Sequence, residues 1–294
     1  MRAEDCVTQE IIAPDPQLDG LWESIITPEQ VTDRLLRHAA LGLSLRGRLP
    51  FTTTALHGLL LLYGPPGTGK TTLARALPQR LAPIVEGKVR LIEVNPHGLM
   101  SADHGRSQQL VSELLCEVIP GRADDGIPTV VVLDEVESMA VARSEASLSA
   151  NPVDVHRATD AVLSAVDLLT NTYPHILTAA TSNFTSGLDA AFISRADVAI
   201  EVPLPSREGL VAILKETLLG YSKAFRPLAQ LAASDDLVTV AEAMIGMDGR
   251  TARKLVADAA ARRLETAVDP GALTLDDLLL AAEGWHAMDL SGSQ

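Results

Sequence analysis

Aromatic and cysteine residues are scarce in this sequence. Phenylalanine, tryptophan and tyrosine make up 3% of the 294 residues, whereas 47% are hydrophobic, so leucine, alanine, valine and isoleucine must build most of the core. This composition is typical of helices packed on parallel strands. The two cysteines, Cys6 and Cys116, lie far apart and outside any CxxC pattern, which argues against a disulfide framework and a zinc site. We expect both to be reduced thiols.

The chain also lacks a basic surplus and a long apolar run. Its formal net charge of −14 repels phosphate backbones, so we expect no direct nucleic-acid contact, although a local basic groove is still allowed. The first ten residues are acidic where a signal peptide is basic, and no apolar run approaches the ~18 residues of a membrane span. We therefore expect a cytoplasmic protein that binds no membrane and acts on a protein or a small metal-bound ligand.

Short apolar runs alternate with longer amphipathic stretches. We expect strands at 59–63, 89–94, 129–133, 176–181 and 198–202, separated by helices around 70–82, 107–119, 153–170 and 187–194. This alternation predicts an α/β fold with a parallel five-stranded sheet sandwiched by helices. Ligands of such sheets bind at the carboxyl ends of the strands.

The pattern changes near residue 205, because the segments beyond it all read as helices. We expect a short N-terminal tail (1–16), a large α/β domain (17–205) and a small helical domain (206–294) of common size.

A glycine-rich segment joins the first strand to the first helix. It matches the GxxxxGK[ST] pattern and, with the threonine that follows, comprises Gly64, Pro65, Pro66, Gly67, Thr68, Gly69, Lys70, Thr71 and Thr72. Such a loop points several backbone N–H groups at one anion, and the positive end of the helix adds to them. Lys70 would reach the β and γ phosphates, and the Thr71 hydroxyl would ligate Mg²⁺. An ordinary Gly/Pro turn is the alternative.

A second strand, 130–133, ends in carboxylates. Asp134 would complete the metal site, and Glu135 would orient or deprotonate the attacking water. A strand-end carboxylate in plain solvent is the alternative for Glu135. Glu137 points away from Glu135 in any regular geometry, so we expect a surface or ion-pair role for it.

Two more polar residues lie next to strands. Asn183 closes the fourth strand, where its amide could hold the lytic water; a turn-capping asparagine is the alternative. Arg195 precedes the fifth strand, away from its own phosphate loop, and could reach the nucleotide of a neighbouring subunit. A local salt bridge to Asp197 is the alternative.

The helical domain contains GMDGRTARKL, in which Arg250 begins a helix and Arg253 follows one turn later on nearly the same face. One of the two could touch the γ phosphate and report hydrolysis to this domain. Solvated helix charges are the alternative.

This order of parts resembles the AAA+ ATPases, in which the helical domain is a lid. Within them it resembles the pachytene-checkpoint branch, whose members remodel HORMA-domain proteins. The segments that carry this closer likeness are GLWESI (20–25), LIEVNPHGLMS (91–101), LDEVESMAVAR (133–143), NPVDVHRATDAVLSAVD (151–167), TSNFTSGLDAAFISRAD (181–197) and GRTARKL (249–255).

The resemblance implies a homohexameric ring that uses ATP and Mg²⁺ to open HORMA-domain proteins. Since only about 16 residues precede the AAA+ part, the chain looks like the compact bacterial members found beside cyclic-oligonucleotide anti-phage signalling enzymes (CBASS). There the ATPase would disassemble a complex of HORMA protein and synthase. Partner recognition would use the ring itself.

The same likeness places a substrate-gripping pore loop in MSADHGRSQQLV. The family usually carries an aromatic residue there, whereas this chain has Asp103 and His104, so His104 or Met100 would grip weakly. Trp22 would lie near the adenine pocket or anchor the core.

One rival interpretation is a DNA-directed AAA+ ATPase of the clamp-loader or helicase-loader type, which shares the phosphate-site residues. The acidic charge and the DEVES and GLWESI segments argue against it. A nucleotide-switched scaffold without catalysis is another, but it requires the loss of Glu135 or Arg195, and both are present.

Overall fold

The computed structural model describes residues 2–95, 106–141, 152–184 and 187–289, with side chains omitted at 152–155 and 286–289. By its contacts the chain divides into two units. The first comprises residues 1–24, 28–64 and 70–202, and the second comprises 25–27, 65–69 and 203–294.

The first unit is built on a mostly parallel sheet. Its strands are β1 (Val7–Ala13), β2 (Leu59–Tyr63), β3 (Val89–Val94), β4 (Thr129–Leu133), β5 (Ile176–Ser182) and β6 (Val198–Glu201). Their order is β1-β3-β4-β5-β2-β6. Among these strand pairs, β1 with β3 is antiparallel and the others are parallel. The α/β class is confirmed, but the prediction of five strands is wrong because the sheet has six.

The missed strand is β1, which lies within residues 1–16. It pairs from Val7 to Ala13 with β3 at the edge of the sheet, and its side chains alternate between buried and exposed positions. The expected strands were recognised by continuous apolar runs, which mark strands buried on both faces. An edge strand with one wet face, and polar residues at Thr8, Gln9 and Glu10, carries no such run.

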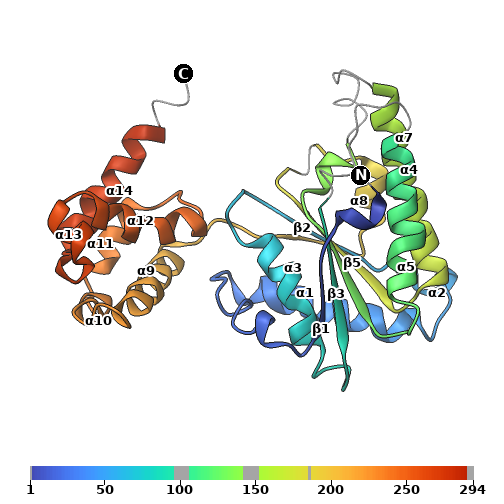
Figure 1. The fold of residues 1–294 in the computed structure, drawn as a ribbon, viewed down its shortest axis with the longest axis horizontal. Helices are drawn as coiled ribbons and strands as arrows, with labels where there is room; N and C mark the ends of the chain where they lie inside the picture. The colour runs from blue at the N-terminus through green and yellow to red at the C-terminus, as the bar shows by residue number, and fades with distance from the viewer. Residues whose placement is uncertain (1, 96–105, 142–151, 185–186, 290–294) are drawn as a thin grey trace. The chain divides into compact units, whose positions relative to one another are not determined.

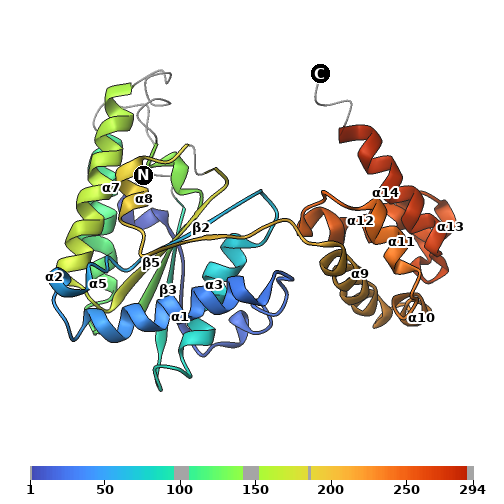
Figure 2. The same ribbon diagram turned by 180° about the vertical axis from the view of Figure 1, so that it is seen from behind.

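Helices cover both faces of this sheet (Figures 1 and 2), with α1 and α3 on one face and α4, α5 and α7 on the other. The helical segments of this unit are η1 (Ala3–Cys6), η2 (Pro16–Leu18), α1 (Glu29–Arg46), α2 (Phe51–Thr54), α3 (Lys70–Leu81), α4 (Arg106–Glu113), η4 (Leu114–Val118), α5 (Ile119–Arg122), η5 (Val136–Ser138), α7 (Pro152–Thr172) and α8 (Ala190–Ser194). Because both faces are covered, all five residues of β4 are buried.

The second unit contains helices and no described strand. Its segments are α9 (Arg207–Ser222), α10 (Leu228–Ala232), α11 (Leu237–Ala243), α12 (Gly249–Ala261), α13 (Leu264–Val268), η6 (Pro270–Ala272) and α14 (Leu275–Asp289). Leucine, isoleucine, valine and alanine side chains of α9, α11 and α12 form a separate core, together with Met244 and Met247 from the segment between α11 and α12. Side-chain caps begin α9 and α12: Ser206 accepts a hydrogen bond from Gly209 N, and Asp248 accepts from Arg250 N.

Both cysteines are free thiols. No helix in the described part of the chain combines the length and the apolarity that spanning a bilayer demands.

Candidate nucleotide site

Three neighbouring strands bring the predicted site residues to one edge of the sheet. In the order β4, β5, β2, the acids Asp134 and Glu135 follow the first strand, Asn183 follows the second and the glycine-rich loop follows the third. Because the three strands are parallel, their carboxyl ends meet at the same edge. Asn183 therefore lies between the loop and the acids.

A threonine and an aspartate meet at this edge. The Thr71 hydroxyl donates to Asp134 Oδ1 at 2.6 Å, and the Thr181 hydroxyl donates to the same oxygen at 2.5 Å. In the described residues the hydrogen bonds to this carboxylate come from hydroxyls and not from a cation, so its negative charge is not neutralised. A hydroxyl beside an uncompensated carboxylate suits a hard cation such as Mg²⁺, which prefers oxygen ligands.

Lys70 and Asn183 connect the loop to the acids. Lys70 is buried, and its Nζ donates to Gly64 O at 2.8 Å and to Asn183 Oδ1 at 3.0 Å. Asn183 Nδ2 in turn donates to Glu135 Oε1 at 3.4 Å. A relay of hydrogen bonds thus runs from the loop lysine through the amide to the predicted catalytic acid.

Glu135 has an unusual backbone conformation. Its φ of 50° and ψ of 52° are left-handed, a conformation that costs a residue with a Cβ roughly 1–2 kcal/mol. Its N–H donates to the Thr181 hydroxyl at 3.1 Å, which holds the turn. The turn sends consecutive acids in different directions, with Asp134 toward Thr71 and Glu135 toward Asn183. Strain of this kind clusters at functional sites.

The prediction for Glu137 is wrong. Its Oε1 accepts a hydrogen bond from Asn183 N at 3.1 Å, and Oε2 is buried without a hydrogen-bond partner among the described residues. The prediction assumed regular geometry, whereas the left-handed Glu135 and the short helix η5 turn Glu137 back toward the end of β5. Glu137 therefore fixes the backbone of Asn183 instead of lying in a surface ion pair.

Thr181 was missed by the sequence analysis. This buried residue donates to Asp134 and accepts from Glu135 N, so one hydroxyl orients both acids. A carboxylate near this site, Glu93, has a pKa that is raised by burial. The Arg75 guanidinium at 3.0 Å opposes the rise, and the negative charge of Asp134 adds to it. The signal for Thr181 was a hydroxyl near the carboxyl end of β5, two residues before Asn183.

The glycines of the loop adopt backbone conformations that other residues avoid. Gly64, Gly67 and Gly69 have φ values of 139°, 77° and 98°. A Cβ on Gly64 would strike Val202 O, so strand β2 could not continue into this loop with a larger residue. The loop is closed on itself by a hydrogen bond of 2.9 Å from the Thr68 hydroxyl to Pro65 O.

Arg250 lies in the second unit, to which loop residues 65–69 also belong. Its N–H donates to Gly67 O at 3.2 Å, and its side chain is exposed. Arg253 instead lies 3.7 Å from Glu216. This difference favours Arg250 over Arg253 as the predicted sensor.

Arg195 lies near the amino ends of the strands, at the other end from Asp134 and Asn183. Its Nε and Nη2 donate to Asp167 Oδ1 and Oδ2 at 2.7 and 2.8 Å. The alternative of a salt bridge to Asp197 is wrong, because the Asp197 carboxylate accepts from His57 N and Gly58 N at 2.7 and 2.8 Å. These two residues precede β2, whereas the phosphate loop follows it.

Two further predictions concern the pore loop and Trp22. Asp103, His104 and Met100 lie outside the described residues. Trp22 is half-buried, with Arg80 Cζ 6.0 Å from its ring centre. Its placement near an adenine pocket stays a prediction.

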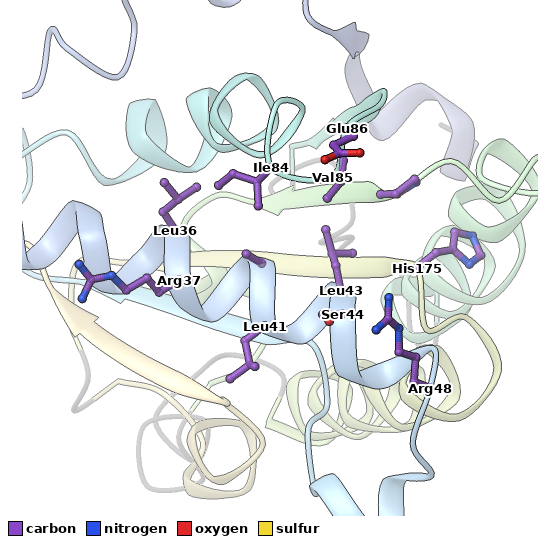
Figure 3. Close-up of a pocket in the computed structure, with 12 residues that line it drawn as sticks. Leu36, Arg37, Leu41, Leu43, Ser44, Arg48, Ile84, Val85, Glu86 and His175 are labelled. Carbon is purple, nitrogen blue, oxygen red and sulfur yellow. The ribbon is translucent and has the colours of Figure 1, made fainter.

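A groove of about 810 Å³ lies elsewhere on the first unit (Figure 3), between α1 and the segment 84–86. Its lining combines leucines with Arg37, Arg48, Glu86 and His175. It contains no glycine-rich loop and no pairing of a hydroxyl with a carboxylate, so it does not qualify as the phosphate site.

The class that this sheet and loop define is the ATPase family associated with various cellular activities (AAA), whose family model matches residues 60–204. CD-NTase-associated protein 6 of Pseudomonas aeruginosa is 43% identical over 96% of this chain and 92% of its own length. A pachytene checkpoint protein 2 homolog of Arabidopsis thaliana is 38% identical over 70% of this chain, which covers 45% of that protein. The chain thus spans about half the length of this plant relative.

A solved structure of an E. coli MS115-1 HORMA:CdnC:Trip13 complex contains a chain similar in fold, with a TM-score of 0.75, 16% identity and 96% coverage of both chains. At that identity the similarity concerns the fold. The chain belongs to the AAA ATPases, in the family of CD-NTase-associated protein 6 and the pachytene checkpoint protein 2 homologs. The resemblance indicated by the motifs is confirmed.

Proposed function

We propose that this chain is an ATP-driven protein remodeler that works in the cytoplasm as a homohexameric ring. In this proposal it hydrolyses ATP, opens HORMA-domain proteins and disassembles their complexes with a cyclic-oligonucleotide synthase in CBASS anti-phage signalling. The observation that carries the enzymatic part is the relay from Lys70 through Asn183 to Glu135, beside the pair Thr71 and Asp134.

Each group at this edge has a chemical role in the proposal. Mg²⁺, held by Thr71 and Asp134, would supply positive charge to the phosphate oxygens. The backbone N–H groups of the loop and the Lys70 ammonium bind the phosphates. Glu135 accepts a proton from the attacking water, and Asn183 orients that water without adding charge.

Arg195 would act on the nucleotide of a neighbouring copy. The segment that carries it is attached at the start of β2, and the phosphate loop begins at the other end of that strand, roughly 20 Å away at ~3.3 Å per residue. One arginine side chain does not span that distance. An arginine that reaches a neighbour's phosphate neutralises charge that develops in the transition state.

The partner assignment rests on the relatives. A protein named for association with a CD-NTase is 43% identical to this chain, and a chain of similar fold occurs in a complex with HORMA and CdnC. The proposal extends to the helical domain at 206–294, to Arg250 as the lid sensor, and to Asp103 and His104 as substrate contacts.

The test is a pull-down from the native host with the variant Glu135→Gln in the presence of ATP, because this variant should bind nucleotide without turning it over. Lys70→Ala, which should not bind nucleotide, is the control. We expect a HORMA-domain protein to be enriched only in the pull-down that contains both Glu135→Gln and ATP. Equal recovery with the control, or a catch without any HORMA-domain protein, would overturn the partner assignment.

A further inference from the structure

The guanidinium of Arg195 is held along one side by a single carboxylate. Asp167, on helix α7, accepts from Nε and Nη2 in a two-point geometry at 2.7 and 2.8 Å. A third donor, Nη1, donates to Ala191 O at 3.0 Å within helix α8. Two-point pairing fixes the plane of a guanidinium as well as its position.

Part of the guanidinium stays available. It has five N–H groups, and the three hydrogen bonds that the described residues provide leave one N–H on each Nη nitrogen. A pair of this kind can donate to two oxygens of one phosphate. The Arg195 side chain is 23% exposed, so a neighbouring molecule can reach it.

The main chain next to Arg195 is fixed as well. Asp197, two residues later, accepts hydrogen bonds from the N–H groups of His57 and Gly58, and its own N–H donates to Leu59 O at 2.8 Å. Arg195 is therefore attached to the start of β2 through its backbone and to α7 through its side chain.

The buried Arg46 braces this attachment. Its Nη1 donates to Ile176 O at 2.6 Å, and it fills the space where a side chain on Gly58 would lie. Burial lowers the pKa of Arg46 to about 10, against the opposing effect of Asp197, so this guanidinium is still charged at neutral pH. The buried Arg46 guanidinium therefore holds the backbone of this attachment. The Arg195 side chain is not needed for that role and is left for another purpose.

We infer that Asp167 is a positioning residue for ATP hydrolysis: it orients Arg195 so that its two remaining N–H groups face the phosphate of a neighbouring copy. The inference rests on the proposed function, in which Arg195 acts in trans. Asp167 itself touches no substrate, and its effect on the rate passes entirely through Arg195. The Arg195 guanidinium lowers the pKa of Asp167, so the pair stays ionised at neutral pH.

A salt bridge that merely ties α8 to α7 predicts something different. In that case loss of Asp167 weakens the fold or the assembly, and the loss adds to the effect of removing Arg195. A positioning role predicts that Asp167 matters only while Arg195 is present. A double-mutant cycle separates the two, because it measures the coupling directly.

The experiment measures kcat and KM for ATP, the melting temperature and the sedimentation of the assembled protein. The variants are Asp167→Asn, Asp167→Ala, Arg195→Ala and the double variant Asp167→Ala with Arg195→Ala. Asp160→Asn is the matched control, since it removes an exposed carboxylate two turns earlier on the same helix.

We expect Asp167→Asn and Asp167→Ala to lower kcat by roughly 10- to 100-fold, the usual effect of misplacing a catalytic group, with KM and assembly unchanged. The double variant should be no slower than Arg195→Ala, and Asp160→Asn should match the wild type. Multiplied effects in the double variant, or a normal kcat in Asp167→Asn, would overturn the inference.

Failure of the proposed function has a different signature. If Arg195→Ala keeps full activity, or if the wild type hydrolyses no ATP, then the trans role itself falls. If Arg195→Ala is inactive while both Asp167 variants turn over normally, only the role of Asp167 falls.

Discussion

Asp134 at one end of the sheet's strands and two carboxylates at the other end are held in different ways. At the carboxyl ends of the strands, Asp134 is bound by the hydroxyls of Thr71 and Thr181. At the amino ends, two acids meet guanidinium groups: Arg195 binds Asp167 and Arg90 binds Asp125, each through two hydrogen bonds.

The difference indicates which carboxylate charges are already neutralised within the chain. A carboxylate matched by a guanidinium has its charge neutralised, so it can fix structure without a ligand. A carboxylate held by neutral hydroxyls keeps its charge, and in the proposed function that charge binds the Mg²⁺ that accompanies ATP. Arg195 lies between these two cases. It neutralises the charge of Asp167, but part of its own guanidinium remains available to a ligand.

The largest effect should come from the carboxyl end. We expect Glu135→Gln to lower kcat for ATP by up to about 10⁴-fold, since an amide accepts no proton from water. ATP binding, measured by calorimetry, should stay close to that of the wild type. Undiminished turnover would remove Glu135 from its role and with it the functional contrast between the two ends.

Arg195→Ala should follow, with kcat about 10³-fold lower because developing charge is no longer neutralised. Mixing this variant with Glu135→Gln sharpens the test. In a ring, about a quarter of the interfaces would then combine an intact Glu135 with a neighbour's intact Arg195, so activity should return. Two inactive variants that stay inactive when mixed would contradict the action in trans.

Thr181→Val should have a moderate effect. It removes the hydroxyl that orients both Asp134 and the Glu135 backbone while keeping the side-chain shape, and we expect kcat to fall roughly 10- to 100-fold. Thr181→Ser keeps the hydroxyl and is the control. Steady-state ATPase rates decide the matter, and equal rates for Val and Ser would show that the hydroxyl is dispensable.

The smallest effect on catalysis is expected at Arg90 and Asp125. Hydrogen bonding to Arg90 lowers the pKa of Asp125 from 3.8 to about 2. Because the folded-state pKa is depressed, the contribution of this pair to stability is complete above pH 3.8 and is lost as the pH falls toward 2. A carboxyl NMR titration should give a midpoint near 2 in the wild type.

Arg90→Gln is the complementary variant. The midpoint of Asp125 should move back toward 3.8 in this variant, while its ATPase rate stays within about twofold of the wild type, as for other sites away from function. A large loss of rate would show that the amino end does more than fix structure.

The carboxyl end was largely predictable from sequence, whereas the amino end was not. Adjacent residues in a short motif, such as Lys70 and Thr71, carry their chemistry in their spacing. Asp167 and Arg195 lie 28 positions apart on two helices, and no local pattern pairs them. Glu137 was misjudged because one left-handed residue redirects the chain, and that conformation leaves no mark on residue type when the residue is a glutamate.

The antiparallel strand β1 affects how copies of this chain can associate. An open sheet flank offers unpaired backbone groups to any other extended chain, and it invites fibrous association. Here Glu10 on that strand binds Arg90 at 3.1 Å and Arg122 at 2.7 Å, so a foreign strand laid along it would have to disrupt fixed charges. Strand β1 therefore resists pairing with a foreign strand at this edge of the sheet, so in the proposed ring we expect the copies to meet through other surfaces.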